Sequence, residues 1–387
     1  MPAQQRGQGS SVALLGRLVL AKFASATGMT RTELENLTGL SRNVVANVVA
    51  SLVERGELVE EEQPRATGGR GRPAVRYRRA ALVPPVLLIR LGSDGSTAVS
   101  PVHAPDAGDA AVGCAPWTAD WPEWSRSVAS AAERASARSQ ARPRLVVLAV
   151  PFPVAEGESA PPTYPVPYRV LETTGMRLVA RPAWLTGDPR DAVEDLLGCT
   201  ALMVSDAHLA ALGEARYGAG RGRSAIVHVS TGGGIRAGLV FGGRLYTGGH
   251  GLAGELAHVQ VDPEGYPCFC GSRGCLATEA AVLTRAGPAG RPAELGLLVG
   301  RALIPLLTVF DPDCVVVDAR LGRAAESFIA ALRAQAAASC PRQLLDRLVI
   351  VPGELDDAVR TGALAAADGY AATMVARTTQ VGPFLAN

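Results

Sequence analysis

The hydrophobic positions between residues 28 and 62 recur first at the spacing of helices and then at that of strands. Thr30 and Glu33 have the spacing of a capping box at the start of a short helix, and a Gly39-Leu40 turn follows. An amphipathic segment at 12–24 precedes them, so the pattern predicts a three-helix helix-turn-helix. Five apolar side chains would share one face of its last helix: Val45, Val48, Val49, Leu52 and Val53.

The outward positions near the start of that last helix are polar. Ser41 can cap the helix, and Arg42, Asn43 and Asn47 point away from the apolar face. Asn pairs with adenine and Arg with guanine through two hydrogen bonds each. We therefore expect these four residues to contact the base edges of double-stranded DNA.

A pair of strands is predicted next, at "GELVEEE" and "AVRYRRA". The loop between them, "QPRATGGRGRP", is too polar and glycine-rich to pack, which indicates the wing of a winged helix-turn-helix. Arg65, Arg70 and Arg72 lie in this loop, and arginines on an extended loop enter a minor groove or bind phosphates. The alternative is an interdomain linker that is rich in arginine.

From about residue 84, short apolar runs alternate with alanine-rich helical stretches. The runs are "VLLIRLG", "RLVVLAV", "ALMVSD", "AIVHVS" and "CVVVDA". Strands that alternate with helices predict an α/β fold with a largely parallel sheet, here in two lobes around a cleft. We expect a DNA-binding domain at 1–80, a small lobe at 81–199 that includes a C-terminal helix at 367–387, and a large lobe at 200–366.

The charge is distributed unevenly around a net value of +2. Residues 1–80 hold twelve basic and seven acidic groups, whereas the remainder holds 26 basic and 29 acidic groups. This asymmetry favours a polyanion as partner of the N-terminal domain, although a basic solvated face would look similar. No run approaches twenty uninterrupted apolar residues, so we expect a cytoplasmic protein without a membrane partner.

Three of the seven cysteines fall within "CFCGSRGC" at residues 268–275. In the cytoplasm thiols stay reduced, which favours metal ligation over a disulfide. His258 together with Cys268, Cys270 and Cys275 makes a Cys3His set, which suits a closed tetrahedral zinc site. Four protein ligands leave no open position for catalysis, so the expected zinc is structural. The alternative is three buried free cysteines.

These residues resemble the ROK family (repressor, open reading frame, kinase) over nearly the whole chain. The resemblance rests on His258 with CxCGxxGC and on "GLAGELAH", "SDAHLAALGE" and "GRGRP". It implies a sugar-kinase-like body of the actin/hexokinase type and, as in the family's repressors, an N-terminal winged helix-turn-helix. It also implies that Glu255 and His258 face ligand hydroxyls and that Asp206 stands where a kinase has its catalytic base. Without a kinase function, Asp206 could serve only as a helix cap.

The sequence departs from the family's kinases at three places. Arg90 stands at the aspartate position of the first phosphate loop, Arg236 replaces a glycine of the second, "GGGIRAG", and Ala319-Arg320 replaces a Gly-Gly pair. A cation cannot hold Mg²⁺, and a long side chain obstructs the approach of backbone to phosphate. We therefore expect no use of ATP, no enzyme activity, and a vestigial Asp206.

The sugar-facing pattern is also altered. Ser205, His208 and Ala277 stand where the family has Asn, Asn and Glu, and Glu279 lies two residues too far along the chain. A lost hydrogen-bonding partner weakens a polar ligand by about 1–3 kcal/mol. The effector therefore stays open between a modified or phosphorylated sugar, an unrelated molecule and none. If Arg90 and Arg236 line the cleft, they favour an anion.

Together these features predict a transcriptional regulator that acts as a homodimer on an operator with two half-sites. We expect it to repress transcription rather than activate it. Two alternatives remain. One is an ATP-dependent sugar kinase that also binds DNA. The other is a regulator that has lost its effector.

Overall fold

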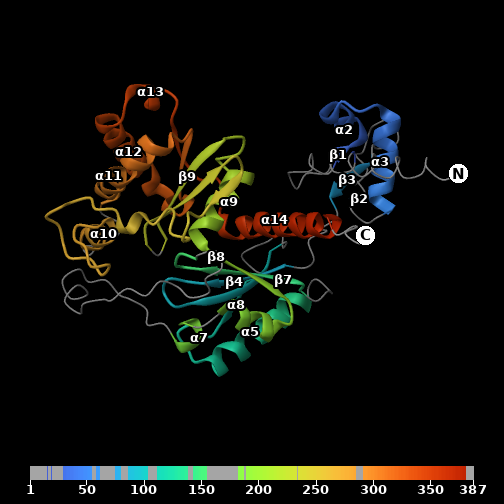
Figure 1. The fold of residues 1–387 in the computed structure, drawn as a ribbon, viewed down its shortest axis with the longest axis horizontal. Helices are drawn as coiled ribbons and strands as arrows, with labels where there is room; N and C mark the ends of the chain where they lie inside the picture. The colour runs from blue at the N-terminus through green and yellow to red at the C-terminus, as the bar shows by residue number, and fades with distance from the viewer. Residues whose placement is uncertain are drawn as a thin grey trace, which may run out of the picture. The chain divides into compact units, whose positions relative to one another are not determined.

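The chain divides into two units, Met1–Pro84 and Pro85–Asn387. The computed structural model describes residues 15, 19, 29–54, 58–61, 75–79, 86–102, 111–137, 143–154, 182–186, 189–232, 234–284 and 291–380. Figure 1 shows the helices and strands of both units.

The first unit contains two helices and a small antiparallel sheet of order β1-β3-β2. Its elements are β1 (Met29–Thr30), α2 (Arg31–Thr38), α3 (Arg42–Glu54), β2 (Leu58–Glu61) and β3 (Arg76–Arg79). The predicted capping box is confirmed, because the Glu33 amide donates to Thr30 Oγ1 at 3.2 Å and the Thr30 amide donates to Glu33 Oε2 at 2.7 Å. Gly39 ends α2 in the left-handed conformation, with φ 69°.

The predicted apolar face of α3 forms the core of this unit. Val45, Val48, Val49 and Leu52 are buried, and Val53 is partly buried against them. Leu34 of α2 and Tyr77 of β3 complete the cluster. Helices α2 and α3 with the β2-β3 hairpin form a winged helix-turn-helix. Of the expected helix at 12–24 the structure describes only residues 15 and 19, and both are helical.

The second unit begins with a five-stranded sheet of order β6-β5-β4-β7-β8. Strands β4, β7 and β8 are parallel, and β5 and β6 add antiparallel edges. The strands are β4 (Val86–Leu91), β5 (Thr97–Pro101), β6 (Val112–Cys114), β7 (Leu145–Val150) and β8 (Thr200–Ser205). Helices α5 (Trp121–Ala137), α7 (Ala183–Thr186) and α8 (Pro189–Leu197) accompany it, and Trp124 and Leu185 are buried in its core.

The second sheet has the order β11-β10-β9-β12-β13, in which β9, β12 and β13 are parallel. Its strands are β9 (Ala225–Ser230), β10 (Arg236–Phe241), β11 (Arg244–Tyr246), β12 (Cys314–Val317) and β13 (Val349–Pro352). The associated helices are α9 (Asp206–Tyr217), η1 (Leu256–His258), α10 (Leu276–Thr284), α11 (Pro292–Phe310), η2 (Ala319–Ala324), α12 (Ala325–Ser339) and α13 (Arg342–Leu345).

Helix α14 (Ala358–Gln380) packs along α9 and also contacts β4 and β7. Figure 1 shows it between the two sheets. The expected α/β class is confirmed. Strand β8 pairs with β7, so the first sheet extends to Ser205. The C-terminal helix begins at Ala358 and packs against α9. The division into lobes at 81–199 and 200–366 stays a prediction.

By length and composition alone, α11 is apolar enough to cross a membrane. In the fold it lies against α12, and its buried residues include Val299, Leu303 and Leu307. A core helix of a soluble protein passes the same test, so this helix is not by itself a sign of a membrane span.

Candidate functional site

The predicted metal ligands meet at one point of the second unit. The ligand atoms of His258, Cys268, Cys270 and Cys275 all lie within 4.8 Å of one another. His258 Nδ1 lies 3.6 Å from Cys268 Sγ, and the Sγ atoms of Cys270 and Cys275 lie 3.7 Å apart. We call these four residues the cysteine knuckle.

These separations fit zinc. With Zn–S bonds of about 2.3 Å and a Zn–N bond of about 2.0 Å, the edges of a tetrahedron are about 3.5–3.8 Å. Burial raises the pKa of the Cys268 and Cys275 thiols and lowers the pKa of His258. The lowered pKa favours the neutral imidazole that a ligand requires, and metal binding would have to displace the protons of the thiols.

The knuckle is built by local backbone contacts. The Val261 amide donates to the Gly274 carbonyl at 2.8 Å, and the Cys268 amide donates to the Ser272 carbonyl at 2.8 Å. Gly274 has φ +62°, and a Cβ there would lie 1.4 Å from the Asp262 carbonyl oxygen, so only glycine fits. Glu279 accepts from the Tyr266 amide at 2.8 Å and thus supports this loop.

The candidate effector residues lie where α9 and β10 begin. Asp206 Oδ1 is 2.7 Å from Arg236 Nη2, and their side chains are 16% and 6% exposed. Asp206 is thus not only the first residue of a helix, because its carboxylate also pairs with a buried guanidinium. Arg236 is not a surface arginine, and its charge is already compensated.

Glu255 and His208 complete this region. Burial raises the pKa of Glu255, and Arg236 opposes the shift while Asp206 adds to it. Burial also lowers the pKa of His208, whose Nε2 lies 2.9 Å from the Ala253 carbonyl oxygen. A neutral His208 therefore holds the loop that carries Glu255 against α9.

The other two unusual arginines have carboxylate partners as well. Arg90 Nη2 lies 2.5 Å from Asp357 Oδ1, and Arg320 Nη2 lies 2.7 Å from Asp318 Oδ2. The sequence analysis did not find Asp318 or Asp357. Asp357 lies 267 positions from Arg90, and no local pattern relates residues so far apart.

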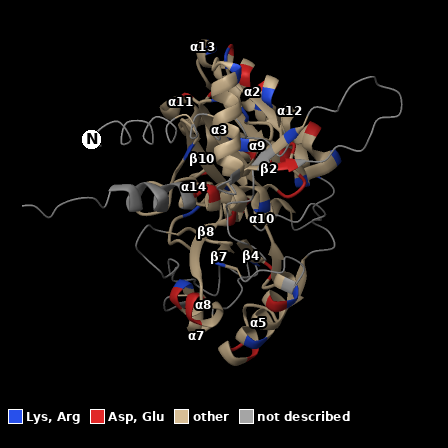
Figure 2. Cartoon of the chain, turned by 90° about the vertical axis from the view of Figure 1, so that its right-hand side faces the viewer, with Lys and Arg blue, Asp and Glu red and all other residues tan. Residues whose placement is uncertain are grey.

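The structure also places part of the candidate DNA-contacting set. Ser41, Arg42, Asn43 and Asn47 are all exposed, Ser41 directly before α3 and the other three in its first two turns, whereas Val45, Val48 and Val49 are buried. Arg65, Arg70 and Arg72 lie outside the described residues. In the described part of the first unit five arginines accompany five glutamates, so the positive excess of residues 1–80 falls elsewhere. Figure 2 accordingly shows few charged residues on α3.

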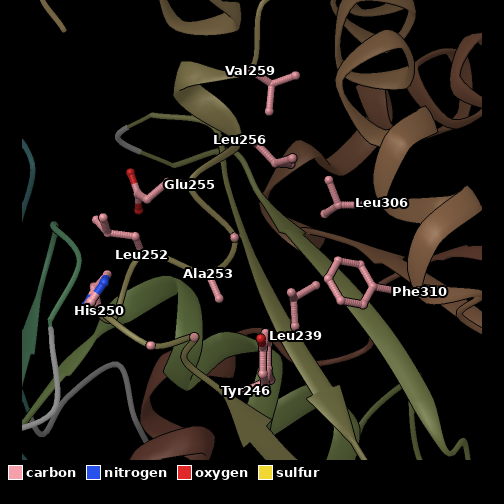
Figure 3. A pocket seen from close by; sticks show the side chains of 13 residues that line it. Leu239, Tyr246, His250, Leu252, Ala253, Glu255, Leu256, Val259, Leu306 and Phe310 are labelled. Carbon is pink, nitrogen blue, oxygen red and sulfur yellow. The ribbon is translucent and has the colours of Figure 1, made fainter.

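An apolar pocket of about 410 Å³ lies on the second sheet, between β10, β11, the 248–259 loop and the end of α11. Tyr246, Phe310, Leu239 and Leu306 line it. Figure 3 shows the Glu255 carboxylate on the side of the loop away from Phe310. Glu255 also lines the pocket, and its charge interacts with Arg236 and Asp206, so the pocket adjoins the Asp206 and Arg236 region.

The part of the chain that contains the knuckle is similar to known proteins. Residues 172–289 match the model of the ROK family. Over 100 residues the chain is 41% identical to a glucokinase of Thermotoga maritima. The aligned stretch covers 26% of this chain and 32% of that enzyme. Over 196 residues it is 24% identical to the xylose repressor of Bacillus subtilis, covering 44% of this chain and 51% of the repressor. The chain thus spans about a third of the one relative and half of the other.

A solved structure shares the fold over more of the chain. It is described as a ROK family transcriptional regulator, a homolog of the E. coli MLC protein, and aligns with a TM-score of 0.63 at 19% identity. The alignment covers 93% of this chain and 97% of the other. Because the first unit makes up more than a fifth of the chain, the alignment extends into both units.

Proposed function

The chain carries a ROK family domain at residues 172–289, and on that premise we propose that it is a DNA-binding transcriptional regulator, a repressor by preference. The observation that carries the proposal is the winged helix-turn-helix of the first unit. Its helix α3 exposes Ser41, Arg42, Asn43 and Asn47 while its apolar face is buried. Residues at the start of such a helix contact base edges in the major groove.

The proposal assigns the wing arginines a supporting role. Arg65, Arg70 and Arg72 would bind phosphates or enter the minor groove beside the α3 contact. Two copies of the chain would read two half-sites, as two-fold symmetric DNA readers do. In this reading the protein works in the cytoplasm on its operator.

The second unit would serve as the effector and dimerisation body. His258, Cys268, Cys270 and Cys275 fit a structural zinc, which would hold the loop after Glu255 in place. Glu255, His258 and the Asp206 region are the candidate contacts for a sugar or other small effector. A ligand there changes DNA affinity only if it binds two arrangements of the body differently.

The rival function is a sugar kinase, and the identity to a glucokinase supports it. Three observations speak against it, because Arg90, Arg236 and Arg320 all form ion pairs with carboxylates of the chain itself. Asp206, the candidate base, is paired with Arg236 rather than free to accept a proton. We therefore propose that the body is not an enzyme.

The test is a gel-shift titration of the purified chain with DNA from upstream of its own and neighbouring genes, at several salt concentrations. We expect saturable, sequence-selective binding. Asn43→Ala should weaken it about tenfold or more, because a bidentate base contact is worth about 1–3 kcal/mol. Asn36→Ala, on the exposed face of α2, is the matched control and should bind as the wild type does.

The wing is tested in the same titration. Arg70→Ala/Arg72→Ala should weaken binding to all fragments alike and reduce the slope of log affinity against log salt by about two. Equally weak binding to every fragment, lost at modest salt, would contradict the regulator and leave only a polyanion-binding segment.

A further inference from the structure

The arginines at the three departures from the family pattern are gathered in one region of the second unit. Each of them lies within ion-pair distance of an aspartate, and together the six residues carry three positive and three negative charges. The pairs are Arg90–Asp357 at 2.5 Å, Arg236–Asp206 at 2.7 Å and Arg320–Asp318 at 2.7 Å.

Two of the pairs connect different elements of the unit. Arg90 belongs to β4 of the first sheet, and its partner Asp357 directly precedes α14. Asp206 directly follows β8, the edge strand of the first sheet, and begins α9, which packs against β10, where its partner Arg236 begins the strand. The Arg90–Asp357 pair therefore joins the first sheet to the start of α14, and the Asp206–Arg236 pair fastens α9 to the second sheet where the first sheet ends.

Arg320 links the two connecting pairs. Its pKa is raised mainly by its hydrogen bonds and charge interaction with Asp318, and the charges of Asp206 and Asp357 add to the shift. Its guanidinium also donates to Ser230 Oγ at 3.2 Å. A Cβ at Gly232, in the second phosphate-loop segment, would lie 2.3 Å from Arg320 Nη1. The guanidinium thus fills the space over this loop.

The Arg236–Asp206 pair is buried but not fully hydrogen-bonded. Although Nη2 and Oδ1 lie close together, neither Nη1 nor Nη2 has a hydrogen-bond acceptor among the residues that the structure describes. The pair is therefore held by charge, and its buried N–H groups retain unused donor capacity. A ligand hydroxyl could accept from Arg236 and donate to Asp206 at the same time.

We propose that these six residues form an ionic latch, which occupies this region of the second unit when no ligand is bound and which an entering ligand must open. The three departures are then not separate losses, because each introduced cation faces a carboxylate of the chain. The latch goes beyond the proposed function, since it concerns the ligand-free body and operates whether or not the chain binds DNA.

The first test is a double-mutant cycle on the buried pair, read by thermal unfolding of the full chain without DNA or ligand. Arg236→Met and Asp206→Asn should each lower Tm by roughly 5–10 °C, because each leaves a buried charge unpaired. The double variant should recover at least half of that loss. Arg291→Met and Glu294→Gln, in an exposed pair on α11, form the control cycle and should shift Tm by less than about 1 °C.

The second test asks whether the pairs act together. Arg320 and Asp206 belong to different pairs, so the latch predicts that the Tm shifts of Arg320→Met and Asp206→Asn are not additive. Arg90→Met should also speed hydrogen exchange at residues 234–238 by about tenfold, although Arg90 is in another sheet. Additive shifts, with exchange changed only next to each substitution, would overturn the latch.

Variants that keep the charge serve as a control in case the charge-removing variants do not fold. Arg236→Lys and Asp206→Glu alter reach but not charge, and the latch predicts faster exchange at 206–210 in folded protein. Unchanged exchange in both would contradict it. Because no DNA enters these measurements, failure of the latch leaves the regulator untouched, and loss of DNA binding leaves the latch untouched.

Discussion

The cysteine knuckle and the Asp206–Arg236 region lie in the same unit but differ in what completes them. The knuckle brings four possible metal ligands together, with their atoms within 4.8 Å of one another. In the other region three arginines each have an aspartate of the chain as partner.

The comparison teaches that the two sites are under different physical requirements. A metal knuckle works only as a complete set, because each missing ligand leaves a buried thiol or imidazole without its metal. In a cleft, ion pairs within the chain can instead take the place of an external ligand, and the buried charges then still compensate one another. We therefore expect the knuckle to support the fold and the ion pairs to limit what can bind beside them.

Loss of the knuckle's metal should have the largest effect. We expect about one zinc per chain, and its removal by a chelator or by Cys270→Ser/Cys275→Ser should lower the free energy of unfolding by at least about 5 kcal/mol. Metal analysis and thermal unfolding check this. Cys340→Ser, a half-buried cysteine at the end of α12, is the control. An unchanged Tm after complete chelation would show that the knuckle does not need a metal.

Replacement by alanine should destabilise the protein to different extents at two glycines in the loop of the knuckle. Gly274→Ala should destabilise by more than about 3 kcal/mol and lower zinc content, because the new methyl group would overlap the Asp262 carbonyl. The methyl group of Gly271→Ala would contact no neighbouring atom. This variant should therefore lose only about 1 kcal/mol of stability, because alanine disfavours the positive φ at this position. If urea unfolding shows that Gly274→Ala and Gly271→Ala lower the free energy of unfolding equally, this explanation is wrong.

Acid should destabilise the second unit through a histidine beside the latch. Burial lowers the pKa of His228 to about 4, from about 6.5 when unfolded. As pH falls from 6.5 to 4, the unfolded state takes up the proton first, so stability declines by up to about 1.4 kcal/mol per pH unit. His228→Asn should flatten this slope in urea titrations at several pH values, and exposed His250→Asn should not.

Glu255 should contribute the least to stability. Burial raises the pKa of Glu255, so its ionised form is disfavoured by the fold, and glutamine has nearly the same shape without the charge. Glu255→Gln should therefore change the free energy of unfolding at pH 7 by no more than about 1 kcal/mol, far less than Asp206→Asn does. If Glu255→Gln and Asp206→Asn lower the free energy of unfolding equally, Glu255 is an ionised partner of Arg236.

Much of the fold could be predicted because its determinants are local. The spacing of the valines in α3, the Thr30–Glu33 capping box and the apolar runs of the central strands all give their elements directly. The short β1 and the placement of β8 in the first sheet could not, since both depend on pairing with distant strands.

The candidate sites divide in the same way. The knuckle was predictable because its four ligands span only eighteen residues and their chemistry is specific. The partners of Arg90 and Arg236 were not, because Asp357 and Asp206 approach them only through the folding of both sheets. From the sequence, Arg90 and Arg236 were expected to oppose the binding of Mg²⁺ and phosphate, or to favour an anionic ligand, whereas in the structure each is paired with an aspartate.

We propose that the body has kept its metal knuckle and no longer binds a nucleotide. This claim is tested most directly by calorimetric titration of the full chain with Mg²⁺ and ATP, with a sugar such as glucose present. We predict no saturable binding up to millimolar nucleotide and no release of ADP. Saturable binding in the micromolar range, with sugar-dependent ADP release, would contradict the claim and make the chain a kinase.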